Sequence, residues 1–206
     1  MTNTHTNESG RSMIEMLGVL AIIGVLSVGG IAGYSQAMSK FKVSKTTDQI
    51  QTMVTNIRTL FAGQRTYKGL AGSGDTNSKD FSTAHTMGIL TDETWDGSNA
   101  SNAYGGSIIF TTPNSHHNFA ITYNGLPQDA CTRMVMADWG DASSGLVGLV
   151  VKGTEQKDGY STGDLTFSTA KAGETGGFPV NLTDSVDACK EGASGDNTSS
   201  ITWVYR

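Results

Sequence analysis

Glu15 is a carboxylate at the edge of a long apolar segment, and its position is the most chemically informative in the chain. The next 24 residues, Met16 to Ser39, carry no charged side chain. As a helix they would extend roughly 36 Å, enough to cross a bilayer core of about 30 Å. A carboxylate deep in lipid costs on the order of 2.5 to 3.5 kcal/mol and is usually paired. The sequence therefore predicts a membrane-spanning helix that begins with an acid in need of a cation.

The chain holds two cysteines, Cys131 and Cys189, well beyond the apolar segment. If this part of the chain lies outside the cytoplasm, its thiols are exposed to oxidising conditions, which favours a structural disulfide. The rival interpretation is a catalytic or metal-binding pair. That interpretation requires a nearby base or further ligands in the sequence, and neither cysteine has any.

The remaining candidates for chemistry are weak. His116 and His117 are adjacent, and in a strand they would point to opposite faces, so we expect no metal site there. Four acids could offer oxygen ligands to calcium but lack EF-hand spacing, and we expect a solvated acidic face; they are Asp184, Asp187, Glu191 and Asp196. The sequence has no nucleophile motif, P-loop, dinucleotide fingerprint or zinc-protease motif. We therefore expect no enzymatic activity, no catalytic residues, no metal and no cofactor.

Composition sets further limits. The chain has 206 residues, 16% charged and 37% hydrophobic, with 26 glycines, which suits one loop-rich domain plus a membrane helix. A net charge of -5 argues against a general nucleic-acid binder.

The helix is expected to continue past the apolar segment as an amphipathic half. Apolar residues recur at spacings of three and four, with charged residues such as Lys42, Lys45 and Asp48 between them. The apolar stripe comprises Met38, Phe41, Ile50, Met53, Val54, Ile57, Leu60 and Phe61. Ala62 and Gly63 should end the helix.

The rest of the chain predicts an α+β fold with an antiparallel sheet. A loop is expected over Gly69 to Asp80, a short helix over Phe81 to Leu90 and another helix over Gln128 to Trp139. The strands are expected at Ser107 to Thr112, Asn118 to Tyr123, Leu146 to Lys152, Leu165 to Ser168 and Ser200 to Tyr205.

Glycines in the apolar segment have two interpretations. Gly29, Gly30 and Gly33 allow membrane helices to pack closely, and they also form a weak point where the helix could melt. Each glycine costs about 0.5 to 1 kcal/mol relative to alanine.

The residues from Gly10 to Leu17, followed by the Gly- and Ile-rich helix Gly18 to Tyr34, resemble the class III signal sequence of type IV prepilins. The resemblance implies peptidase cleavage between Gly10 and Arg11 and N-methylation of Arg11. Glu15 then becomes the fifth mature residue, as in that family. In a filament its carboxylate would neutralise the N-terminal ammonium of a neighbour, inside a core where an unpaired charge costs several kcal/mol.

Further segments resemble the head of type IVb pilins: Met87 to Leu90, Tyr104 to Phe110, Asn118 to Thr122 and Leu126 to Cys131. The resemblance implies a leader at 1–10, a transmembrane and assembly half-helix at 11–39, an amphipathic half at 40–61, and a globular head at 62–206. The helix would pack on an antiparallel sheet head with one disulfide.

The same resemblance implies a major subunit that polymerises with itself into a pilus, or fimbrium, serving adhesion, aggregation or conjugation. Its other partners would be the prepilin peptidase and the pilus assembly machinery, with no nucleic acid expected. The chain would sit in the inner membrane as a single-pass protein and then in the extracellular pilus. Three alternatives stay open: a minor pilin or secretion-system pseudopilin, a membrane-anchored or secreted binding protein, and a membrane-tethered hydrolase.

Overall fold

The structure of the protein is a computed structural model, which describes residues 9–70, 78–160, 163, 165–171, 173–190 and 198–206; residues 9–12 and 78–80 are described by their backbone alone. The chain divides into two compact units, Met1–Phe41 and Lys42–Arg206. The expected leader, residues 1–10, lies almost wholly outside the described residues.

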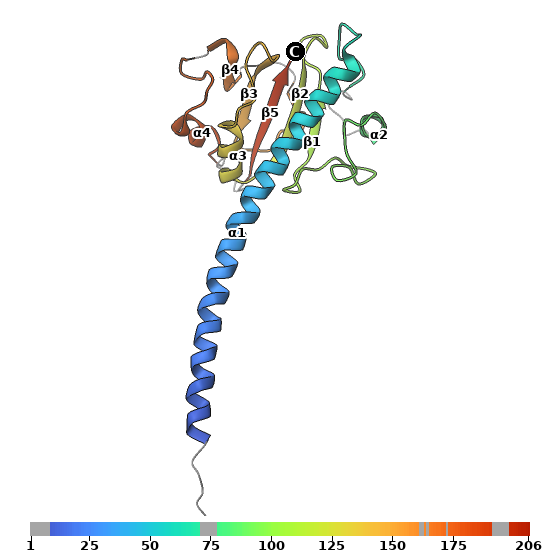
Figure 1. Cartoon of the computed structure of the whole chain (residues 1–206). Coiled ribbons are helices and arrows are strands. Elements are labelled where there is room, and N and C mark those ends of the chain that lie inside the picture. Colours follow the sequence, from blue (N-terminus) through green and yellow to red (C-terminus); the bar gives the residue numbers. More distant parts are fainter. Residues whose placement is uncertain (1–8, 71–77, 161–162, 164, 172, 191–197) are drawn as a thin grey trace, which may run out of the picture. The chain divides into compact units, whose positions relative to one another are not determined.

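One helix, α1 (Ser9–Phe61), supplies the described part of the first unit and the opening of the second (Figure 1). In the first unit, every side chain from residue 13 to residue 37 is exposed. In the second unit, the helix buries Ile50, Met53, Val54 and Ile57, which confirms the amphipathic half. The helix ends at Phe61, as the following glycine-containing turn predicts. Two residues of the predicted apolar stripe stay exposed, Phe41 at 59% and Leu60 at 40%.

The second unit contains a five-stranded sheet in which all neighbours are antiparallel. The strands are β1 (Ile108–Thr111), β2 (Phe119–Leu126), β3 (Leu146–Lys152), β4 (Phe167–Ser168) and β5 (Ser199–Tyr205). Their order is β1-β2-β5-β3-β4, so the last strand of the chain lies in the middle of the sheet (Figure 1). The predicted α+β class and antiparallel sheet are confirmed.

The described helices of the second unit beyond α1 differ in part from the predicted ones. They are α2 (Ser78–Thr86), α3 (Gln128–Val135), the 3-10 turn η1 (Thr169–Lys171) and α4 (Leu182–Ala188). Helix α2 begins inside the predicted loop and stops before Leu90, because Gly88 adopts a left-handed backbone (φ 74°) that ends a helix. Helix α4 and η1 were not predicted, since both are too short to show periodicity.

Strand β4 has two residues where four were predicted. The hydroxyl of Thr166 accepts a hydrogen bond from the backbone N–H of Val151 at 2.9 Å and donates to its carbonyl. Here a side chain replaces the backbone–backbone hydrogen bonds that would continue the pairing of β4 with β3, so β4 is shorter than predicted.

The two faces of the sheet are covered differently. One face carries Ile121, Tyr123, Trp203 and Leu149 into the apolar core shared with α1, where the Tyr123 hydroxyl lies 3.6 Å from the Met53 sulfur. The opposite face mixes polar side chains such as Thr122 and Thr202 with apolar ones such as Val150 and Val204, and residues 153–160 lie over part of it. There the side-chain amide of Gln156 donates to the hydroxyls of Ser200 and Thr202, both at 3.1 Å.

Candidate functional site

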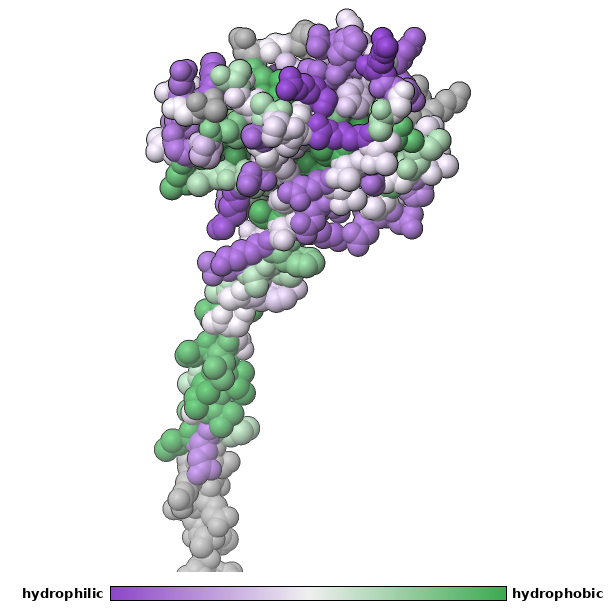
Figure 2. All heavy atoms as spheres, turned by 45° about the horizontal axis from the view of Figure 1, so that its top comes forward, coloured by the Kyte–Doolittle hydropathy of each residue, from purple (hydrophilic) through white to green (hydrophobic). Residues whose placement is uncertain are grey.

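The exposed apolar helix of the first unit is the strongest functional feature of the molecule. It is long and apolar enough to cross a membrane, and none of that span is buried by the chain's own residues. Ile14 is 73% exposed, Leu17 64% and Val25 75%. Figure 2 shows hydrophobic residues gathered along this helix, whereas the face of the second unit seen there mixes hydrophilic, intermediate and hydrophobic residues. An apolar surface of this extent marks contact with lipid or with other proteins.

The predicted processing and assembly residues all fall on this helix. Gly10 and Arg11 lie in its first turn, and Glu15 follows on an exposed position. Only the backbone of Arg11 is described. Glu15 precedes a uniform run of apolar side chains, so it can present a carboxylate at one end of an apolar surface.

The three glycines predicted to allow packing or melting, Gly29, Gly30 and Gly33, lie on the exposed part of α1. A Cβ atom added to Gly29, Gly30 or Gly33 would meet no other heavy atom within 4 Å. Glycine is therefore not required there by any contact inside the described residues. Close packing against another helix, or selection for a less stable helix, would explain glycine at these positions.

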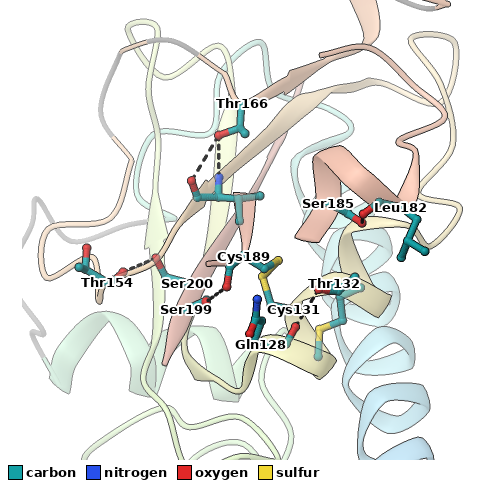
Figure 3. Close-up of a disulfide and its surroundings, with 12 residues drawn as sticks. Gln128, Cys131, Thr132, Thr154, Thr166, Leu182, Ser185, Cys189, Ser199 and Ser200 are labelled. Carbon is teal, nitrogen blue, oxygen red and sulfur yellow. Dashed lines mark hydrogen bonds between the residues drawn. A yellow bond between two sulfur atoms is a disulfide. The ribbon is translucent and has the colours of Figure 1, made fainter. Parts of the chain in front are cut away.

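The disulfide joins Cys131 to Cys189, which confirms the pairing expected of the head. Cys131 lies in α3 and Cys189 caps α4, so the bridge ties together two helices that the sequence separates by 58 positions (Figure 3). Both cysteines are fully buried. The Ser199 hydroxyl donates to the carbonyl of Cys189 at 3.0 Å and links the bridge to the central strand. The pair is structural, with no base or ligand set beside it among the contacts described.

His116 and His117 do not lie in a strand, the setting in which they were expected to point to opposite faces. Both residues lie in the turn between β1 and β2, where Asn114, Ser115 and His116 adopt left-handed backbones with φ between 55° and 66°. The Nδ1 atom of His116 lies 2.8 Å from the hydroxyl of Thr112. Within the described residues, no group of three or more His, Cys, Asp or Glu side chains could hold a metal.

The acidic residues near the end of the chain take local structural roles. Asp184 donates its backbone N–H to the side chain of Asn181, the N-cap of α4, and Asp187 pairs with Lys190. Glu191 and Asp196 lie outside the described residues.

A buried polar cluster was missed from the sequence. Asn102 donates to the carbonyl of Asn124 at 2.8 Å, and Asn124 accepts from the backbone of Gln156 at 2.9 Å. These amides attach the β3–β4 connection and the approach to β1 to the middle of β2. Isolated Asn and Gln residues carry no pattern that predicts such burial.

Three tyrosines of the second unit have raised pKa values, and burial is the main cause at each. The pKa of Tyr104 is raised to about 12, with a further contribution from the charge of Asp129. The pKa of Tyr205 is raised to about 12 despite the opposing charge of Arg58. The pKa of Tyr123 is raised as well. These phenols therefore remain neutral packing groups at ordinary pH.

Comparison with known families identifies the class of this protein. The family model described as Bundlin matches residues 36–206. The chain therefore belongs to the Bundlin family, a family of type IV pilins. The match begins at residue 36, so it does not reach Gly10, Arg11, Glu15 or the glycines of the apolar helix.

Comparisons with solved structures and with curated proteins add two findings. The chain resembles the crystal structure of TcpA, a type IV pilin from Vibrio cholerae El Tor biotype, with 14% identity, coverage of 80% of this chain and 99% of that chain, and a TM-score of 0.49. A search of the curated proteins found no match.

Proposed function

We propose that the protein is the major structural subunit of a type IVb-like pilus and polymerises with copies of itself through its apolar helix. The observation that carries this proposal is the helix on which every side chain from residue 13 to residue 37 is exposed and, after Glu15, uncharged. Family membership supports it, since type IV pilins assemble into filaments. The pilus would serve adhesion, aggregation or conjugation.

Processing by a prepilin peptidase is the first step of the proposed mechanism. Cleavage between Gly10 and Arg11 would remove the leader and leave an ammonium at Arg11, which would then be methylated. Before cleavage and assembly, the helix would hold the subunit in the inner membrane as a single pass. The pilus assembly machinery would then move the subunit into the extracellular filament.

Glu15 would set the axial register of the filament. When apolar helices pack side by side, water is excluded from the charges at their ends. The carboxylate of one subunit would neutralise the N-terminal ammonium of the next, and a subunit in the wrong register would leave both charges unpaired. Breaking a buried pair by removing one partner costs about 3 to 5 kcal/mol.

Gly29, Gly30 and Gly33 would allow close packing of helices and local melting during assembly. Support comes from the absence of any contact within the chain that a Cβ at these positions would disturb. Three such glycines lower helix stability by roughly 2 kcal/mol relative to alanine.

The proposal is tested by mass spectrometry of the N-terminal peptide together with the protein content of sheared surface filaments. We expect a mature chain that begins at methylated Arg11 and dominates the filament fraction. A mature terminus beyond Tyr34 would mean an ordinary signal peptide and would exclude the pilin mechanism. A correctly processed chain present in trace amounts would instead identify a minor pilin or a pseudopilin.

A further inference from the structure

One end of the sheet is cationic in a protein that is acidic as a whole. The chain has 19 Asp and Glu residues against 14 Lys and Arg residues. Yet the segments 58–70, 108–123 and 199–206 contain no Asp or Glu at all. Their cations are Arg58, Arg65, Lys68 and Arg206.

The fold brings these three segments together at the end of the sheet where β2 begins and β5 ends. Phe119 pairs with Tyr205 across the two strands, which places Arg206 beside the start of β2. The backbone N–H of Tyr67 donates to the carbonyl of His116 at 2.7 Å. The ring of Tyr67 lies 4.7 Å from that of Phe119. Arg65 and Lys68, which flank Tyr67, are therefore anchored to the same end as Arg206.

The C-terminal residue is fixed in place by several hydrogen bonds. Arg58 donates to the carbonyl of Arg206 at 3.0 Å. The backbone N–H of Arg206 donates to the carbonyl of Gly145 at 2.9 Å, and its guanidinium donates to that of Ala142 at 3.2 Å. In the neighbouring loop, the Oδ1 atom of Asp141, next to Ala142, accepts hydrogen bonds from the backbone N–H groups of Ser143 and Ser144.

The cations at this end of the sheet are exposed to solvent. The side chains of Arg65, Lys68 and Arg206 are exposed, as are those of His116 and His117. Within the described residues, Arg65 and Lys68 form neither an ion pair nor a side-chain hydrogen bond. Both cations therefore remain available to an outside anion.

We infer that this cationic end, defined by Arg65, Lys68 and Arg206, binds an anionic polysaccharide bearing carboxylate or sulfate groups. A polysaccharide fits better than a single-stranded nucleic acid, because unpaired bases are bound by stacking on exposed aromatic rings. Among the described residues of the second unit, the exposed large hydrophobic side chains are Leu60, Met87, Met136 and Leu182, none of them aromatic. The inference concerns a ligand of the head and does not depend on filament assembly, although repetition along a filament would raise the overall affinity.

The test is salt-gradient elution of the full chain, in nonionic detergent, from immobilised heparin as the probe. We expect retention at low ionic strength. The double variant Arg65→Gln/Lys68→Gln should elute at clearly lower salt, with a slope of log affinity against log salt reduced by about 2, taking the value of about 0.9 per cation known for DNA. Lys171→Gln/Lys190→Gln removes the same charge from exposed positions in another region and should elute like the unmodified protein.

Three results would overturn the inference. The first is a lack of retention of the unmodified protein, and the second is an equal loss of retention in both double variants, which would show an effect of net charge. The third is tighter binding to immobilised duplex DNA than to heparin with the same dependence on Arg65 and Lys68, which would assign the end to nucleic acid. Near-ultraviolet circular dichroism of each variant verifies that the head is folded.

Discussion

Removal of the disulfide should destabilise the head by about 4 kcal/mol. The bridge closes a loop between residues 58 positions apart, and the chain-entropy relation gives about 4 kcal/mol for a loop of that length at 25 °C. Cys131→Ala/Cys189→Ala is the appropriate perturbation, because both cysteines are fully buried and neither variant leaves a polar group in the core. Without the bridge the unfolded chain gains conformational entropy, which lowers the free energy of unfolding. The folded arrangement of α3 and α4 should therefore persist.

Tryptophan fluorescence during urea unfolding measures this loss in the head alone. Trp95, Trp139 and Trp203 all lie in the second unit, so the signal is independent of the apolar helix. With a urea slope of about 2 kcal/mol/M, the midpoint should fall by about 2 M. The unmodified protein treated with a reductant is the matched control and should unfold near the same midpoint as the variant. A shift below about 0.5 M with an unchanged slope would refute the argument that the bridge is a major constraint on this fold.

Four further predictions test the other parts of the molecule. Glu15→Gln should leave membrane insertion and leader cleavage intact but reduce filament yield steeply, and wild-type yield in shear preparations would contradict the register mechanism. A truncated chain of residues 42–206 should be monomeric and folded by size-exclusion chromatography and circular dichroism, since that unit contains the whole sheet and both cysteines. Head stability should fall as pH rises from about 10 to about 12: the unfolded tyrosines ionise near 10, whereas the pKa of Tyr104 and of Tyr205 is raised to about 12, so the folded state resists ionisation. Gln156→Ala should cost about 1 to 3 kcal/mol in urea unfolding, because it removes two hydrogen bonds under the 153–160 segment; an unchanged midpoint would show that this segment does not stabilise the sheet.

The sequence was sufficient to predict the elements whose periodicity is long or regular. The helix over Ser9–Phe61 was visible from its charge-free first part and from the spacing of Ile50, Met53 and Ile57. Strand β3 matches its predicted range from Leu146 to Lys152. The buried residues of α1 recur at the helical spacing, whereas β3 is a short, nearly continuous apolar run that is buried at most positions, as expected for a strand inside a sheet.

The order of the strands could not be predicted, because period-2 patterns do not indicate which strands are neighbours. Placing β5 between β2 and β3 depends on contacts between residues far apart in the chain, such as the pair of Tyr123 with Ile201. The buried hydroxyls of Thr122 and Thr202, 2.7 Å apart, look like exposed positions of an antiparallel sheet when taken from the sequence alone. The segment 153–160 that covers them has no periodicity of its own.

Because β5 lies in the middle of the sheet, the head can fold only when this strand is available. This strand forms backbone pairs with β2 on one side and β3 on the other, so the sheet is incomplete until residues 199–205 are in place. The same strand carries Trp203 into the core and binds the carbonyl of Cys189 through Ser199. If the subunit is exported as the proposed function requires, the head therefore cannot reach its folded state while residues 199–205 are still inside a translocation channel. The apolar helix, in contrast, can insert as soon as it emerges, because it needs no contact with the head to satisfy its backbone hydrogen bonds. Membrane insertion should thus precede folding and disulfide formation, and the membrane would hold the subunit while its head closes around β5.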